Sequence, residues 1–339
     1  MTIDQSVDLI KKKYHKAIVT GGAGFIGSHI CEELVTRGFS VVSIDNYSAG
    51  RKENLKHLKK YKNFKEINCD VTDFVKLNRY FKGVDLVFHN AAAKKSVCLK
   101  DPRKDLKVNG EGTFNMLQLA VKHKVKKFVH ASTGSVYGEA IYMPQDEKHP
   151  TNPVSFYGVS KLAGEKYVQI HQRLFGLNTT ILRYFHVYGS RQEYNEFGGV
   201  VAIFVEKLLS GKTPIIFGSG KQERSFTYVK DVVKANFIVA CKDGTEGKIY
   251  NCASGIKVTV NELCLAVLKH FDKQNLKPIY QDWLIGDIKV FDIDNSKIKK
   301  LGMSFQTNFF QQLDITIEEI KTYIQKINEK KPKAKIKTK

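Results

Sequence analysis

Long apolar stretches are absent from this sequence. None of its apolar runs approaches the roughly 20 residues that a membrane-spanning helix needs. Residues 1–16 are polar and rich in lysine, without the apolar segment of a secretory signal peptide. We therefore expect no membrane span and no secretory leader.

Cysteine is scarce and dispersed. The chain has six cysteines, and none of them forms a C-x-x-C pair. This spacing argues against a zinc site and against a disulfide framework, and it fits a reducing compartment. We expect no bound metal and a cytoplasmic location.

Acidic residues are outnumbered by basic ones, 34 to 55, which gives a formal net charge of +21. Such a charge can indicate binding to nucleic acid or to an anionic membrane surface. The lysines are spread along the chain, however, and no tandem aromatic and basic motif of an RNA-binding module is present. We expect a basic surface that attracts an anionic substrate, no specific nucleic-acid partner, and a disordered basic tail over residues 329–339.

The first half of the chain alternates between short apolar runs and helical patterns. The strand-like runs are 16–19, 40–44, 64–67, 84–89, 127–131 and 179–183. The helical patterns between them are 26–37, 75–81, 110–123 and 159–175. Alternating strands and helices predict an α/β fold of Rossmann type, a doubly wound parallel sheet with right-handed crossovers.

The alternation breaks at about residue 184. Loops there join shorter elements, with helical patterns at 200–210 and 260–271. We predict a Rossmann domain over 14–183, to which 226–254 returns, and a smaller C-terminal α/β substrate-binding region over 184–328.

A glycine-rich turn follows the first predicted strand. Residues 20–27 read Thr-Gly-Gly-Ala-Gly-Phe-Ile-Gly and open the first helical pattern. We expect Gly21 to permit the tight turn, Gly24 to let the backbone approach phosphates, and Gly27 to let the helix pack closely. Free N–H groups and the positive end of a helix dipole favour a pyrophosphate at this position.

Asp45 ends the second predicted strand. A carboxylate at this place accepts hydrogen bonds from the hydroxyls of the adenosine ribose and repels a 2′-phosphate. The sequence therefore favours NAD over NADP.

Tyr157 and Lys161 form a Tyr-x-x-x-Lys motif on a predicted helix. Residues four apart share one helix face, so the ammonium lies beside the phenol and favours the phenolate. Such a tyrosine can act as a base near neutral pH. The hydroxyls of Ser132 and Thr133 follow the fifth strand, at the sheet edge where a ligand of an open α/β sheet binds.

With these motifs together, the chain resembles the extended short-chain dehydrogenase/reductases, and among them the nucleotide-sugar epimerases of UDP-glucose 4-epimerase type. The resemblance covers about residues 16–302 and includes the G-x-x-G-x-x-G spacing of the glycine turn. It also includes Arg-Tyr-Phe-His-Val-Tyr-Gly at 183–189 and Gln-Glu-Arg-Ser-Phe-Thr-Tyr-Val at 222–229.

The resemblance implies the residues of the site. The expected catalytic residues are Thr133, Tyr157 and Lys161. The expected NAD-binding residues are Gly21, Gly24, Phe25, Ile26, Asp45, Asn46, Asp70, Val71, Ala91, Ala92, Lys94, Asn109, Tyr157, Lys161 and Tyr184. The expected substrate-binding residues are Lys94, Thr133, Tyr157, His186, Arg224 and Asp287.

The resemblance also implies a reaction. Tyr157 would take the proton of the sugar 4-hydroxyl while hydride passes from C4 to NAD, and the 4-keto sugar would rotate and take the hydride back on its other face. Arg224 would bind the diphosphate of a nucleotide sugar, most readily a UDP-linked one. A homodimer formed by the helices at 110–123 and 159–175 is also implied.

The sequence departs from related patterns at several positions. Gly134 and Ser135 stand where the 4,6-dehydratases carry Asp-Glu, and the second of these positions is a Glu in the sugar-acid decarboxylases. His186 replaces an Asn beside the substrate phosphates, and Leu284 replaces an Arg that contacts the diphosphate. Phe291 aligns with the wall of the sugar pocket.

Two other functions stay open at this point. The protein could be a nucleotide-sugar dehydrogenase or reductase with net redox turnover. It could also be a non-enzymatic NAD- or RNA-binding member of the fold, as the charge of +21 suggests.

Overall fold

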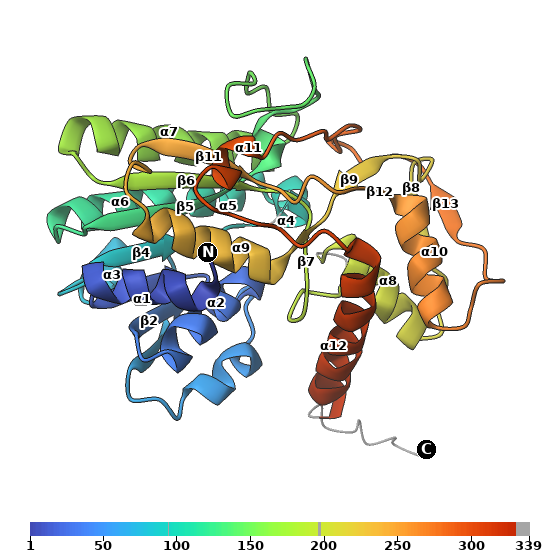
Figure 1. Cartoon of the computed structure of the whole chain (residues 1–339), viewed down its shortest axis with the longest axis horizontal. Helices are drawn as coiled ribbons and strands as arrows, with labels where there is room; N and C mark the ends of the chain where they lie inside the picture. Colours follow the sequence, from blue (N-terminus) through green and yellow to red (C-terminus); the bar gives the residue numbers. More distant parts are fainter. Residues whose placement is uncertain (94, 196–197, 330–339) are drawn as a thin grey trace.

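A computed structural model describes residues 1–93, 95–195 and 198–329. Its centre is a seven-stranded parallel sheet in the order β11-β6-β5-β4-β1-β2-β3 (Figure 1). The strands are β1 Lys16–Thr20, β2 Ser40–Asp45, β3 Phe64–Asn68, β4 Leu86–His89, β5 Lys127–Thr133, β6 Thr179–Tyr184 and β11 Lys248–Cys252. The strand order changes direction between β1 and β4, which is where a doubly wound sheet binds its ligand. The predicted fold class is confirmed.

The central strands β1, β2, β4 and β5 are buried on both faces, which explains their continuous apolar runs. Within β1, Ala17 and Val19 pack into the core on one face, and Ile18 packs into the core on the other. This alternation is the ordinary two-residue period of a strand.

Helices cover both faces of the sheet (Figure 1). The core of one face includes α2 and α9, with α1 packed on α9, and the core of the other includes α3, α6 and α7. These helices are α1 Ile3–Lys13, α2 Phe25–Thr36, α3 Phe74–Asn78, α6 Gly112–Lys122, α7 Phe156–Phe175 and α9 Val229–Cys241. Shorter pieces are the 3₁₀ helices Lys52–Leu58 and Gly134–Val136, α4 Lys95–Lys100, α5 Pro102–Asp105 and the π-helix Leu106–Glu111.

The C-terminal part has a core of its own between α8, α10 and α12. Three pairs of short strands flank it: β7 with β10, β9 with β12 and β8 with β13. The elements are β7 Val187–Tyr188, α8 Val200–Leu209, β8 Ile215–Phe217, β9 Glu223–Ser225, β10 Thr227–Tyr228, β12 Lys257–Thr259, α10 Val260–His270, β13 Ile279–Gln281, α11 Ser296–Lys299 and α12 Phe309–Glu329. The predicted division of the chain at residues 183 and 184 stays a prediction. The predicted tail lies outside the described residues apart from Glu329.

All six predicted strands of the first half are present, and the helices differ mainly at their ends. The helix expected at 110–123 begins at Gly112, because a π-helix precedes it. Among the longer helices, α1, α9 and α12 were not expected from the sequence, and neither were the short helices α4, α5 and α11. A capping box between Thr2 and Gln5 begins α1.

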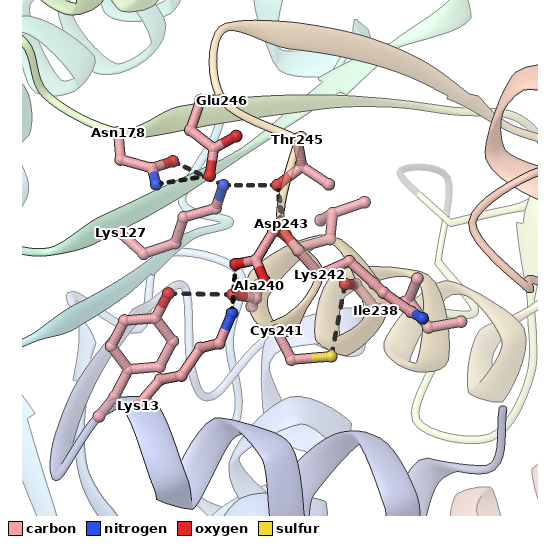
Figure 2. Close-up of polar contacts among 12 residues, drawn as sticks. Lys13, Lys127, Asn178, Ile238, Ala240, Cys241, Lys242, Asp243, Thr245 and Glu246 are labelled. Carbon is pink, nitrogen blue, oxygen red and sulfur yellow. Dashed lines mark hydrogen bonds and ion pairs between the residues drawn. The ribbon is translucent and has the colours of Figure 1, made fainter.

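A buried lysine joins three segments at the amino-terminal edge of the sheet (Figure 2). The Lys127 ammonium of β5 donates to Asn178 Oδ1 at 2.7 Å and to Thr245 Oγ1 at 2.8 Å. It also donates to Thr180 Oγ1 at 2.8 Å. Three acceptors match the three protons of an ammonium, so no donor is left unsatisfied. Burial nevertheless lowers the pKa of Lys127 to about 8.

The same corner of the molecule holds α1 in place (Figure 2). The Lys13 ammonium forms an ion pair with Asp243 at 2.6 Å, just after α9. The Tyr14 hydroxyl donates to the Ala240 carbonyl at 3.0 Å, inside α9. These contacts hold α1 on α9, and the apolar side chains of Val7 and Ile10 add to the core there.

The described part of the chain contains no candidate membrane-spanning helix, no cluster of metal-ligating side chains and no disulfide. No helix there is long and apolar enough to cross a bilayer. No group of three or more His, Cys, Asp or Glu side chains there could hold a metal ion. All six cysteines are buried as free thiols.

The buried Lys127 predicts a specific pH dependence of stability. Its pKa is about 8 in the folded protein and 10.5 as the reference value, so between these values the unfolded chain binds more protons. The free energy of unfolding of the wild type should therefore rise relative to Lys127→Met as the pH increases from about 8 to 10, by up to about 3 kcal/mol. Denaturant titrations of both proteins at a series of pH values measure this, and a difference that stays constant with pH would contradict it.

Candidate active site

A cleft of about 280 Å³ opens at the carboxyl ends of the central strands. Most of the residues predicted to bind the cofactor line it. They are Gly21, Gly24, Phe25, Ile26, Asp45, Asn46, Val71, Ala91, Ala92, Tyr157, Lys161 and Tyr184. These side chains come from residues 21 to 184, and the parallel sheet brings them together because its strands all end at the same edge.

The glycine turn between β1 and α2 leaves no room for side chains. Gly21 has φ 63°, and a Cβ on it would lie 2.9 Å from the Ala91 nitrogen. A Cβ on Gly24 would lie 3.1 Å from the Gly21 carbonyl oxygen, and one on Gly27 would lie 2.2 Å from the same oxygen. The turn is therefore packed backbone against backbone, and Gly24 N-caps α2 without a side-chain hydrogen bond. This cradle at a helix N-terminus fits a pyrophosphate.

Asp45 ends β2 beside the glycine turn. Its carboxylate accepts hydrogen bonds from the Ala23 N–H at 3.0 Å and from the Tyr47 N–H at 2.8 Å. Burial raises the pKa of Asp45. Asn46 donates to the Asp70 carboxylate at 2.6 Å. Asp45 thus lines the cleft at the end of β2, and its role in binding a ribose stays a prediction.

Two predicted cofactor residues lie away from the cleft surface. Asp70 does not line the cleft, and it holds Asn46 and the Thr72 hydroxyl instead. Asn109 is buried behind the cleft, where its Oδ1 accepts from the Ala93 N–H at 2.8 Å. Lys94 lies outside the described residues.

Tyr157 and Lys161 both point into the cleft from the first two turns of α7. Ser155 caps this helix, its side chain accepting a hydrogen bond from the Gly158 N–H. The Lys161 ammonium donates to the Ala131 carbonyl at 2.6 Å. The four-residue spacing seen in the sequence therefore places both side chains on the face of α7 that lines the cleft.

Burial moves the pKa values of the pair in opposite directions. It raises the pKa of Tyr157 to about 12, while a hydrogen bond with Thr133 acts in the lowering direction. It lowers the pKa of Lys161 to about 8, while Glu165 and Asp105 act in the raising direction. Tyr157 thus holds its proton in this structure, and its action as a base near neutral pH requires additional positive charge beside the phenol.

A second cavity, of about 330 Å³, adjoins the first. Tyr184 lines both cavities. The second cavity holds the other predicted substrate residues, Thr133, His186, Arg224 and Asp287, together with Gly134, Ser135, Leu284 and Phe291. The predicted catalytic residues therefore lie where a cofactor in the cleft would meet a ligand in the second cavity.

Arg224 is a buried cation in this second cavity. Its guanidinium donates to Asp287 Oδ2 at 3.1 Å and to the Lys289 carbonyl at 3.1 Å, and it lies over the Phe291 ring at 5.7 Å. Burial lowers the pKa of Arg224, and Asp287 opposes this. His186 has φ 37°, and its ring meets the edge of Phe291 at 4.9 Å. A guanidinium held by a single carboxylate fits the recognition of an anionic group such as a diphosphate.

Sequence reasoning missed the ion pair that supports α7. Arg183 binds Glu165 through two hydrogen bonds of 2.9 and 2.7 Å, and both side chains are buried. The Ser132 hydroxyl donates to the same carboxylate at 2.5 Å. Glu165 lies four residues after Lys161, so continuing the i, i+4 row of α7 would have found it.

A family model matches residues 17–253, which is most of the chain. The chain belongs to the NAD-dependent epimerase/dehydratase family. As a member of this family the protein uses NAD, and the glycine cradle and Asp45 fit that cofactor.

Relatives within this family are similar over most of their length. A Methanocaldococcus jannaschii protein provisionally named UDP-glucose 4-epimerase is 40% identical over 292 residues, covering 84% of this chain and 92% of its own. UDP-glucose 4-epimerase of Mycolicibacterium smegmatis is 35% identical over 310 residues, covering 89% and 97%. The crystal structure of UDP-glucose 4-epimerase from Thermotoga maritima with UDP-glucose has a TM-score of 0.85 at 34% identity, covering 92% and 99%.

Proposed function

We propose that the protein is an NAD-dependent 4-epimerase of a nucleotide sugar, of the UDP-glucose/UDP-galactose type. The observation that carries this proposal is that Tyr184 lines both cavities, and that Thr133 of the second cavity hydrogen-bonds Tyr157 of the cleft. A sugar whose diphosphate lies at Arg224 would extend along the second cavity toward these hydroxyls. The similarity to UDP-glucose 4-epimerases supports the same reaction.

The chain's own residues move and hold the proton. Tyr157 accepts the proton of the sugar 4-hydroxyl and later returns it, and Thr133 hydrogen-bonds the same sugar oxygen. Lys161 lies on the face of α7 that carries Tyr157, where a positive charge favours the phenolate. NAD, when bound, takes up and returns hydride at sugar C4 and adds positive charge beside the phenol, so turnover has no net redox change.

Arg224 and Asp287 are proposed to hold the nucleotide end of the substrate. Arg224 is the buried cation of the cavity, and its partner Asp287 lies within reach of a ribose. His186 adds a ring beside Phe291, and Leu284 adds an apolar wall. The two departures from the family pattern therefore make the phosphate end of this pocket less cationic than a second arginine would.

A dehydratase or decarboxylase reaction fits this site poorly. A side chain at position 134 would collide with the Phe185 ring, since a Cβ there would lie 2.2 Å from Phe185 Cε1. Ser135 is turned toward Thr133, whose hydroxyl lies 3.3 Å from the Ser135 hydroxyl. Neither position supplies the carboxylic acid that such eliminations need for general acid–base catalysis.

The nucleotide sugar is found by direct assay. We expect the purified enzyme, with the NAD it retains, to interconvert a UDP-hexose and its 4-epimer without added NAD, because hydride is returned within each turnover. Incubation with UDP-, GDP-, CDP- and dTDP-sugars, followed by NMR of the products, measures this. Turnover that consumes NAD in proportion to product would favour a dehydrogenase or reductase. A protein that converts none of these sugars but binds RNA in a salt-sensitive manner would favour the non-enzymatic alternative.

Removing the Tyr157 hydroxyl tests the proposed base. Tyr157→Phe should keep its NAD, since the cradle is unchanged, and lose at least about a hundredfold in kcat, since the base is gone. Bound NAD is measured after release from denatured protein, and kcat with the active nucleotide sugar. Tyr167→Phe removes a half-exposed hydroxyl from the same helix and is the matched control. Activity near that of the wild type in Tyr157→Phe would refute the assignment.

We further propose that the protein lies in a reducing cytoplasm, which suits its six free thiols. We also propose that two chains associate through α6 and α7. Large apolar side chains are exposed on these helices: Phe114, Val159, Ile170, Leu174 and Phe175. Covering such a surface with a second copy removes apolar area from water.

Light scattering tests the dimer. The wild type should have the mass of two chains, and Leu174→Lys should shift it to one, because a charge would be buried in the interface. Leu265→Lys, on an equally exposed leucine of α10, should leave the mass unchanged. A wild type with the mass of a single chain would exclude this interface.

A further inference from the structure

Asp105, at the end of α5, is a buried carboxylate outside both cavities. It is 2% exposed and lines neither the cofactor cleft nor the substrate cavity. Its Oδ1 accepts hydrogen bonds from the Asn109 amide at 2.6 Å, the Ser160 hydroxyl at 2.8 Å and the Cys98 thiol at 2.9 Å. Three donors from three different segments thus converge on one carboxylate oxygen.

The three donors connect Asp105 with the segments that face the cofactor. Ser160 is the residue before Lys161 on α7. Asn109 donates to the Ser160 hydroxyl at 3.0 Å and accepts from the Ala93 N–H at 2.8 Å, in the loop after β4. Asn109 lies in the π-helix, a wide turn that is rare and is common at functional sites. One buried oxygen thus joins the catalytic helix, the π-helix and the cofactor loop.

Asp105 differs in charge balance from the other carboxylate near Lys161. Glu165 is neutralised by its two hydrogen bonds to the Arg183 guanidinium. Within the described residues, the hydrogen-bond partners of the Asp105 side chain are a thiol, an amide and a hydroxyl, all uncharged. Asp105 therefore adds a negative charge that none of these partners cancels, and this charge acts to raise the pKa of Lys161.

We propose that Asp105 is a positioning residue of the active site, whose charge and hydrogen bonds keep Lys161 protonated and hold α7 against the cofactor loop. This inference rests on the proposed roles of Tyr157 and Lys161. Asp105 supports Tyr157 and Lys161 from outside, because it lines neither the cofactor cleft nor the substrate cavity.

Among the described residues, four other titratable groups that interact with Lys161 or lie beside it on α7 have pKa values that burial shifts away from neutrality. Burial lowers the pKa of His89 on β4 to about 3 and that of His130 on β5 well below its usual value. Burial raises the pKa of the Cys98 thiol on α4. It raises the pKa of Tyr157 on α7 to about 12. Glu165 is held by Arg183. A change of charge at Asp105 should therefore act on Lys161 and Tyr157 without interference from these neighbours.

The test compares Asp105→Asn with Asp101→Asn in the NAD-loaded full chain. Asp101 is an exposed residue that caps the same helix by accepting from the Lys104 N–H, so it is the matched control. Removing the negative charge at 105 lowers the pKa values of both Lys161 and Tyr157. Both limbs of the kcat profile against pH should move to lower pH by about half a unit to one unit, and Asp101→Asn should leave them in place.

A second variant separates the charge from the hydrogen bonds. Ser160→Ala keeps the Asp105 charge and removes one donor, so we expect a lower kcat with both limbs at their wild-type pH. Equal profiles for Asp105→Asn and Asp101→Asn would overturn the proposal. So would a chain that no longer folds with Asn at position 105, because Asp105 would then be a residue of the folded core alone.

A titration without substrate keeps this inference separate from the proposed function. NMR of lysine labelled with carbon-13 at Cε follows Lys161, identified by the signal that Lys161→Met lacks. The Lys161 midpoint should fall by about half a unit to one unit in Asp105→Asn. If the wild type epimerises no sugar, the proposed function fails, and this titration still decides whether Asp105 controls Lys161.

Discussion

The active site depends on how α7 is held against the sheet. The Glu165–Arg183 pair joins the middle of this helix to β6, and the same carboxylate takes the Ser132 hydroxyl at the end of β5. A buried ion pair adds little net stability, because desolvation offsets most of its attraction, yet removing one partner leaves an uncompensated charge. The pair fixes the position of α7 relative to β5 and β6. It thereby positions Lys161, one turn before Glu165, relative to Thr133, the residue after Ser132.

The cofactor side of the site is built from backbone, and the catalytic side from side chains. At the glycine turn, main-chain atoms approach one another so closely that a single Cβ on Gly27 would overlap the Gly21 carbonyl. At α7, by contrast, burial drives the pKa values of Tyr157 and Lys161 away from their ordinary values, to about 12 and about 8. The negative charge of Asp105 raises the pKa of Lys161 toward its ordinary value but raises that of Tyr157 further from it, so the phenol depends on positive charge from bound NAD.

The substrate side carries the chain's own departures. Phe291 contacts both the Arg224 guanidinium and the His186 ring, so one aromatic side chain restricts the orientation of both groups beside the cavity. Gly134 is required because Phe185 fills the space that a side chain would need. These contacts restrict, by size and by charge, which groups the pocket accommodates. The cofactor cleft, by contrast, follows the pattern of the whole family.

The sequence by itself determined the parallel sheet, the glycine turn and the Tyr157–Lys161 face. Each of these is encoded locally: a strand buried on both faces needs a continuous apolar run, a turn at φ 63° needs Gly21, and residues four apart share a helix face. A capping box begins α1 locally, but only the tertiary structure supplies α9, on which Val7 and Ile10 pack and which lies more than 200 residues away in the chain. The tertiary structure also decided the partners of the buried charges at Lys127, Glu165 and Asp105. A buried charge is tolerated only where the fold brings it polar partners, and such partners come from segments that no local pattern connects.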